Sequence, residues 1–174
     1  MTTATGTREV PSPRSRVWRA LAVLEPYCAV CDVSYVVSGP VGTGTTFVCV
    51  PGRLDAGRPP AATAPRGEIV EWDPQQRVTT RLDLTPETWT TRIEMADADD
   101  RGTRVTITVT HEPKRGGKLL RRVQRGAMQR MVQRMVDSEL DRLPEHLAQL
   151  TPDGVEPPAV ELHPEGEPPP STAR

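Results

Sequence analysis

The chain has 174 residues, a length that fits one domain of ordinary size together with a tail. Its 22 basic and 23 acidic residues give a formal net charge of −1, so global charge does not favour binding to nucleic acid. No apolar run reaches the length of a membrane-spanning helix, and the polar residues 1–8 do not resemble a secretory signal. Three cysteines in such a chain are typical of reduced thiols, and we expect a cytoplasmic protein.

The first predicted element is a short helix over residues 13–24. Ser12 followed by Pro13 is typical of a helix start, with a capping side chain and then proline at the first helical position. Apolar residues then follow at helical spacing, and Pro26 ends the segment. These residues are Val17, Trp18, Leu21 and Leu24.

From residue 33 onward the apolar period changes to two, which predicts about six strands. They cover residues 33–37, 45–50, 68–72, 77–84, 88–95 and 103–111. Residues 51–65, rich in glycine and proline, predict a long loop, and residues 73–76 predict a hairpin connection. Because each strand has one apolar and one polar face, we expect an antiparallel sheet that is covered on one side only.

The expected cover is a long helix over residues 118–150. It would run about 45 Å, which is enough to cross the sheet. Its apolar residues recur every three or four positions: Leu119, Leu120, Val123, Ala127, Met131, Met135, Leu143 and Leu147. The sequence therefore predicts an α+β domain with its helices on one face of the sheet. Residues 151–174, rich in proline and glutamate, predict a disordered tail.

Four segments resemble the START-like superfamily, in particular its polyketide cyclase/dehydrase (SRPBCC-type) branch. They are VPSPRSRVW at residues 10–18, GEIVEWDP at 67–74, GTRVTITV at 102–109, and residues 131–143. The resemblance covers residues 7–150, which leaves residues 1–6 as a flexible N-terminus. It implies a helix-grip fold, in which a curved antiparallel sheet of six or seven strands surrounds the C-terminal helix, with short helices after the first strand. It also implies an apolar pocket, but no single chemistry, because the superfamily includes cyclases, lipid carriers and hormone receptors.

Ten residues are the candidates for lining that pocket, with ordinary core packing as the alternative for the aromatic ones. Thr80 and Thr91, together with His111, would orient a bound ligand by hydrogen bonds. The ten candidates are Tyr35, Phe47, Thr80, Leu82, Trp89, Thr91, Ile93, Ile107, Met131 and Met135.

Cys28 and Cys31 have the spacing of metal ligands or of a redox pair. A zinc site needs two further ligands, and the sequence offers no second cysteine pair and no histidine pair. We therefore predict no metal site and no cofactor. Plain buried or half-buried thiols are the favoured interpretation, and a redox-sensitive pair is the alternative.

No catalytic residue can be assigned from the sequence, and His111 is the candidate. It shares the parity of Val109 at the end of a strand, so it would point inward and serve as a general acid or base. The favoured interpretation is a histidine at the rim that hydrogen-bonds to water or to Glu112. His146 lies near the end of the long helix without a visible partner.

The first half of the long helix carries a basic surface that includes Arg121, Arg122, Arg125 and Arg130. Such a surface can contact an anionic membrane or an acidic partner, and a solvated arginine-rich face is the favoured alternative.

The function expected from the sequence is binding of a small hydrophobic ligand, lipid-like or polyketide-like, by a monomer or homodimer. Whether the protein is an enzyme stays open. The alternatives are a polyketide cyclase/aromatase activity and an interaction through the basic helix.

Overall fold

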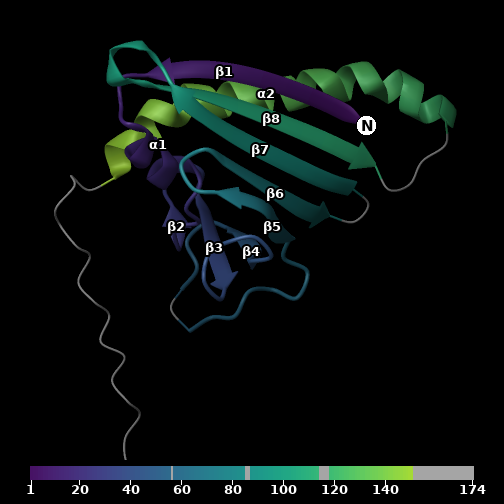
Figure 1. Ribbon diagram of the computed structural model, residues 1–174. Helices are drawn as coiled ribbons and strands as arrows, with labels where there is room; N and C mark the ends of the chain where they lie inside the picture. The colour runs from purple at the N-terminus through teal and green to yellow at the C-terminus, as the bar shows by residue number, and fades with distance from the viewer. Residues whose placement is uncertain (56, 85–86, 114–117, 151–174) are drawn as a thin grey trace, which may run out of the picture.

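The computed structural model describes residues 1–55, 57–84, 87–113 and 118–150, and of residues 100 and 118–125 it describes the backbone alone. These residues form one antiparallel sheet of eight strands and two α-helices (Figure 1). The order of strands across the sheet is β1-β8-β7-β6-β5-β4-β3-β2. The predicted helix-grip architecture, an α+β fold with a curved sheet and a long C-terminal helix, is confirmed.

The strands and helices have the following bounds. The strands are β1 (Thr2–Val10), β2 (Tyr27–Cys28), β3 (Val33–Ser38), β4 (Thr46–Pro51), β5 (Arg66–Asp73), β6 (Arg77–Leu84), β7 (Glu87–Asp97) and β8 (Thr103–Pro113). The helices are α1 (Arg14–Leu21), a 3-10 turn (Asp99–Arg101) and α2 (Lys118–Gln149). All six strands predicted from the alternating pattern are present as β3 to β8, with ends that differ by a few residues.

The two faces of the sheet differ as the alternation predicts. On the inner face of β8, Val105, Ile107 and Val109 are buried. On its outer face, three threonines each pair with a threonine of β1 through side-chain oxygens 3.0–3.1 Å apart: Thr3 with Thr110, Thr5 with Thr108, and Thr7 with Thr106. Because β-branched residues suit both faces of a strand, this outer face stays polar without losing its preference for extended backbone.

The prediction that residues 1–6 form a flexible N-terminus is wrong. β1 begins at Thr2 and pairs with β8 along its whole length, from Thr2 opposite His111 to Val10 opposite Thr103. Thr2 and Ala4 are buried on its inner face. The pairing covers an edge of β8 that would otherwise be open to other chains.

Helix α2 lies along β1 and β8, and its C-terminal end contacts α1 (Figure 1). Its buried row consists of Val132, Val136, Leu140 and Leu143. The approach to β1 is close at Gly6, where a Cβ would lie 2.7 Å from Leu140 Cδ1 and 2.8 Å from Val136 Cγ1. A larger residue at this position would require the ends of these two side chains to shift.

The buried face of α2 is rotated relative to the predicted one. The predicted stripe contained Met131 and Met135, but the structure buries their neighbours Val132 and Val136 instead. The heptad-like spacing of the methionines did not reveal another apolar row, that of Val132 and Val136, beside the row of methionines. The helix therefore has two apolar rows, of which one packs on the sheet and the other lies to its side.

Two further details after β1 differ from the prediction. α1 ends at Leu21, three residues earlier than predicted, and its Trp18 packs edge-on against Trp72 at 4.9 Å between ring centroids. The resemblance implied short helices after the first strand, but the segment after α1 forms β2, in which Tyr27 and Cys28 pair with β3. Within the described part of the chain, no helix has both the length and the apolar character needed to cross a bilayer. The predicted tail, residues 151–174, lies outside the described residues.

Candidate functional site

A cavity of about 620 Å³ lies between the inner face of the sheet and α2. Its wall comes from β3, β4, β6, β7 and β8, from the end of α1, and from α2. All ten residues predicted to line a pocket lie in this wall: Tyr35, Phe47, Thr80, Leu82, Trp89, Thr91, Ile93, Ile107, Met131 and Met135. The alternation of β6 places Val78, Thr80, Leu82 and Leu84 together on the cavity side. Whether a ligand binds there stays a prediction.

The second apolar row of α2 lines one side of the cavity. The side chains of Met131 and Met135 belong to its wall, although the two residues are 42% and 47% exposed. Because the same two side chains line the cavity and reach solvent, the cavity opens to solvent beside them. Unbranched and polarizable, methionine adapts to ligands of different shapes.

The opposite wall, on β3 and β4, is aromatic and uncharged. Tyr35 and Phe47 meet edge-on, with ring centroids 6.2 Å apart. Burial raises the pKa of the Tyr35 hydroxyl, and burial raises the pKa of the neighbouring Cys49 thiol to about 11. Both groups are therefore neutral at physiological pH, which suits an apolar ligand.

Glu87 and Trp89, which belong to the cavity wall, form a polar cluster with His111, which lies behind them. His111 is 4% exposed, and its Nε2 lies 2.6 Å from Glu87 Oε2. The same carboxylate oxygen accepts a hydrogen bond of 3.1 Å from Trp89 Nε1, and the Trp89 and His111 rings are 4.7 Å apart. Among the described residues, His111 Nδ1 has no hydrogen-bond partner.

This cluster changes the interpretation of His111. The inward orientation that its parity predicted is present, but its partner is Glu87 rather than Glu112 or the solvent. Sequence reasoning missed Glu87 because the predicted strand began one residue later, at 88. The register, which places Trp89 opposite His111, brings the carboxylate to the ring. An acid and a base are thus adjacent beside the cavity.

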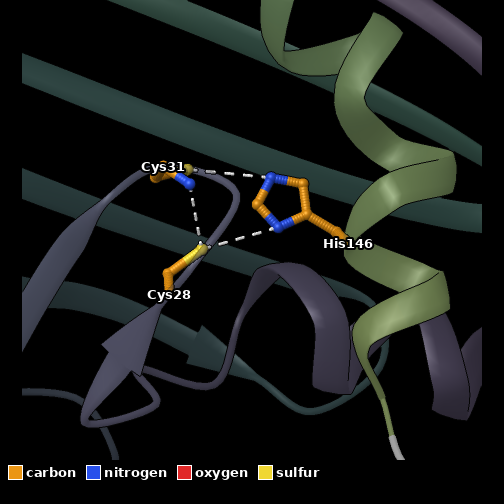
Figure 2. Close-up of side chains that lie close together, drawn as sticks. All are labelled: Cys28, Cys31 and His146. Carbon is orange, nitrogen blue, oxygen red and sulfur yellow. Dashed lines mark hydrogen bonds between the residues drawn. The ribbon is translucent and has the colours of Figure 1, made fainter.

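Cys28, Cys31 and His146 form a second cluster (Figure 2). The Sγ atom of Cys28 lies 3.7 Å from His146 Nδ1, and that of Cys31 lies 3.7 Å from His146 Nε2. A fourth side chain joins them, because Glu139 Oε1 lies 3.2 Å from His146 Nε2. Figure 2 shows both sulfur atoms and the imidazole ring of α2 directed toward one another.

The expectation that His146 has no partner is therefore wrong. The sequence could not show this cluster, because the fold brings together residues that are more than 100 positions apart. Burial, the charge of Glu139 and the neighbouring Cys28 raise the pKa of the Cys31 thiol to about 12. Cys31 and Glu139 also line the cavity, so the two candidate sites share a wall.

The turn that carries both cysteines is held in place by several hydrogen bonds. Tyr27 donates its hydroxyl to Asp32 Oδ1 at 2.9 Å, and the backbone N–H of Gly52 donates to the carbonyl of Asp32 at 2.7 Å. Asp32 adopts the left-handed conformation with φ 51°, which closes the turn. Within the turn, the backbone N–H of Cys31 donates to Cys28 Sγ at 3.4 Å.

The predicted basic surface is only partly within the described side chains. Arg130 is exposed on α2, and its Nε donates to the carbonyl of Gly126 at 3.3 Å. The side chains of Arg121, Arg122 and Arg125 lie outside the described ones. Contact with an anionic membrane or an acidic partner stays a prediction.

Residues 1–148 match the model of a protein family described as polyketide cyclase / dehydrase and lipid transport. The chain belongs to this family. The resemblance seen in the four sequence segments is thereby confirmed. A search of curated protein sequences gave no significant match.

Solved structures with the same fold include proteins from several bacteria. The protein TTHA0849 of Thermus thermophilus is 24% identical, with a TM-score of 0.61 over 84% of this chain and 97% of that one. The Zhui aromatase/cyclase of Streptomyces sp. R1128 is 14% identical, with a TM-score of 0.60 over 84% and 93%. SA2116 of Staphylococcus aureus, a protein of unknown function, is 11% identical, with a TM-score of 0.56 over 84% and 94%. At these identities the similarity establishes the fold alone.

Proposed function

We propose that this protein binds a small hydrophobic ligand, lipid-like or polyketide-like, in the cavity between the sheet and α2. The observation that carries the proposal is the cavity itself, with a volume of about 620 Å³ and a mainly aliphatic and aromatic wall. Sites for small molecules typically have volumes of about 300–1,000 Å³ and combine apolar walls with a few polar groups. Thr80 and Thr91, which are paired across β6 and β7, supply hydroxyls inside this wall.

Apolar burial sets the expected affinity. A ligand that removes about 400 Å² of apolar surface from water gains roughly 10 kcal/mol at about 25 cal/mol per Å². Association costs at least about 4 kcal/mol in lost translational and rotational freedom. The difference corresponds to a dissociation constant of the order of tens of micromolar, before any hydrogen bond to the two threonines is counted.

The test uses an aromatic substitution that fills the cavity and a matched control on the other face of the same strand. Thr91→Phe places a ring inside the cavity, whereas Thr90→Phe places it on the outer face, where Thr90 lies opposite Thr110. Binding is measured by fluorescence titration with an apolar dye, and by native mass spectrometry of the purified protein for a co-purifying ligand. We expect Thr91→Phe to weaken dye binding at least tenfold and Thr90→Phe to leave it within about twofold. Equal affinities in two folded variants would contradict the proposal.

A second candidate function is a cyclase, and the Glu87–His111 pair favours it. Closure of a poly-β-ketone by an aldol reaction needs a base for the proton next to a carbonyl and an acid for the carbonyl oxygen. His111 and Glu87, 2.6 Å apart beside the cavity, supply both groups. We expect His111→Ala to lower turnover of a poly-β-ketone at least 100-fold with dye binding almost unchanged. Unchanged turnover in this variant would leave ligand binding as the function of the cavity.

A further inference from the structure

We propose that Cys28, Cys31 and His146 bind a zinc ion, with Glu139 as the fourth ligand. Cys28 ends β2 and Cys31 lies in the turn that follows it, and the other two ligands come from the C-terminal part of α2. The ion would join the strand at the far end of the sheet to the helix that packs on the opposite end. This site is separate from the proposed binding of a hydrophobic ligand and does not depend on it.

Two of the distances fit a tetrahedral ion. At the usual zinc–ligand lengths, a sulfur and a nitrogen on one tetrahedral zinc lie about 3.6 Å apart, and an oxygen and a nitrogen about 3.4 Å. Here Cys31 Sγ lies 3.7 Å from His146 Nε2, and Glu139 Oε1 lies 3.2 Å from the same nitrogen. The ligand atoms of Cys28, Cys31 and His146 all lie within 4.8 Å of one another. Cys31 and Glu139 approach Nε2, whereas Cys28 Sγ lies 3.7 Å from Nδ1 of the same ring, so coordination at Nε2 requires the Cys28 side chain to turn toward that nitrogen.

The chemistry of the four side chains selects the metal. Two thiolates and an imidazole favour zinc or another soft or borderline transition metal over calcium and magnesium, which prefer oxygen ligands. The carboxylate is a hard ligand and favours zinc over copper(I). Four protein ligands leave no open position for water, so the site belongs to the structural class rather than the catalytic one.

The surroundings support coordination by sulfur. The N–H of Cys31, directed at Cys28 Sγ from 3.4 Å, stabilises a negative charge on that sulfur more than a neutral thiol. The hydrogen bonds of Tyr27 and Gly52 to Asp32 hold the turn in shape. A turn fixed in this way lowers the ordering cost of binding an ion, as partners of metal ligands do in other sites.

Binding would affect the cavity, because Cys31 and Glu139 belong both to the cluster and to the cavity wall. With the ion bound, these two side chains lose their freedom to move into the cavity. The site would therefore fix the position of α2 relative to β3 at that end of the cavity.

The experiment uses the full chain without a histidine tag, reduced and freed of metal by a chelator. The protein is titrated with zinc and dialysed, and its zinc content is then measured by elemental mass spectrometry. Co²⁺ serves as a spectroscopic probe of the same site. We expect one zinc per chain, and for Co²⁺ a thiolate-to-metal charge-transfer band with intense visible bands of tetrahedral geometry. Cys28→Ser should abolish both signals. Cys49→Ser, which removes the cysteine outside the cluster, should retain them.

The fourth ligand is tested with a second matched pair. Glu139→Gln should weaken zinc binding at least tenfold, whereas Glu145→Gln, an exposed neighbour of His146 in sequence, should not change it. An unchanged affinity in Glu139→Gln would overturn the assignment of Glu139.

Stability gives an independent measurement. Zinc at about 100 times its dissociation constant should raise the Tm of the reduced wild-type protein by roughly 5–10 °C and leave that of Cys28→Ser unchanged. The proposal is overturned if the reduced wild-type protein retains no zinc and gives no cobalt bands. It is also overturned if Cys28→Ser binds as tightly as the wild type, or if Cys28 and Cys31 form a disulfide under reducing conditions that keep Cys49 free.

Discussion

The substitution Gly67→Ala adds a single methyl group and tests how closely the cavity wall is packed. Gly67 of β5 pairs with Phe47 of β4 and lies directly under its ring. A Cβ at Gly67 would lie 2.6 Å from Cε2 and 2.9 Å from Cε1 of that ring. Normal carbon contacts are about 3.5–4.0 Å, so the ring must move by roughly 1 Å, and the cavity is the space next to it.

The expected cost follows from two opposing effects. Overpacking a core costs about 1–3 kcal/mol. Alanine in a strand offsets about 0.5–1 kcal/mol of this relative to glycine, because the unfolded chain has less freedom to lose. We expect a net loss of about 1–2 kcal/mol in the free energy of unfolding, which lowers Tm by about 2–8 °C.

A double-mutant cycle identifies the ring as the cause. In a Phe47→Ala background the methyl group has room, so Gly67→Ala should then be neutral or stabilising by up to about 1 kcal/mol. Gly42→Ala is the control, since a Cβ there meets no atom within 4 Å. Unfolding is followed by circular dichroism in denaturant. An equal loss with and without the Phe47 ring would refute the contact and the register of β4 with β5.

Three further predictions test the core and the cavity. Leu143→Ala removes a fully buried side chain of α2 and should lower the free energy of unfolding by about 2–5 kcal/mol, measured in denaturant; a loss below about 1 kcal/mol would contradict its burial. Thr103→Val removes the 2.7 Å hydrogen bond to the carbonyl of Ser12 and should cost about 1–3 kcal/mol, whereas Thr103→Ser should retain most of the stability. Cys49, with its pKa raised to about 11, should react with thiol reagents slowly at pH 8. In a variant without the other two cysteines, its rate should rise about tenfold per pH unit up to pH 11, and a plateau near pH 9 would contradict its burial.

The sheet could be predicted because each strand carries its own signal. Val105, Ile107 and Val109 alternate with threonines, and an alternation of this kind identifies a strand and its inner face without any distant residue. The same local information placed Leu82 and Trp89 in the cavity wall. It failed at β1, where residues 2–6 are threonine, alanine and glycine and become a strand only by pairing with β8. It failed also at α2, where two apolar rows lie side by side and the sequence does not say which one meets the sheet.

The polar clusters could not be predicted because none of them is local. Glu87 comes to His111 through the register of β7 with β8, and a one-residue error in the start of β7 was enough to hide it. His146 comes to Cys28 through the position of α2 over the sheet, which no spacing in the sequence encodes. The pair Cys28 and Cys31 has the spacing of two metal ligands. The sequence predicts no zinc site because it offers no second pair of ligands. Because the C-terminal part of α2 supplies that second pair, the helix that covers the sheet also provides the residues that would complete a metal site at its far edge.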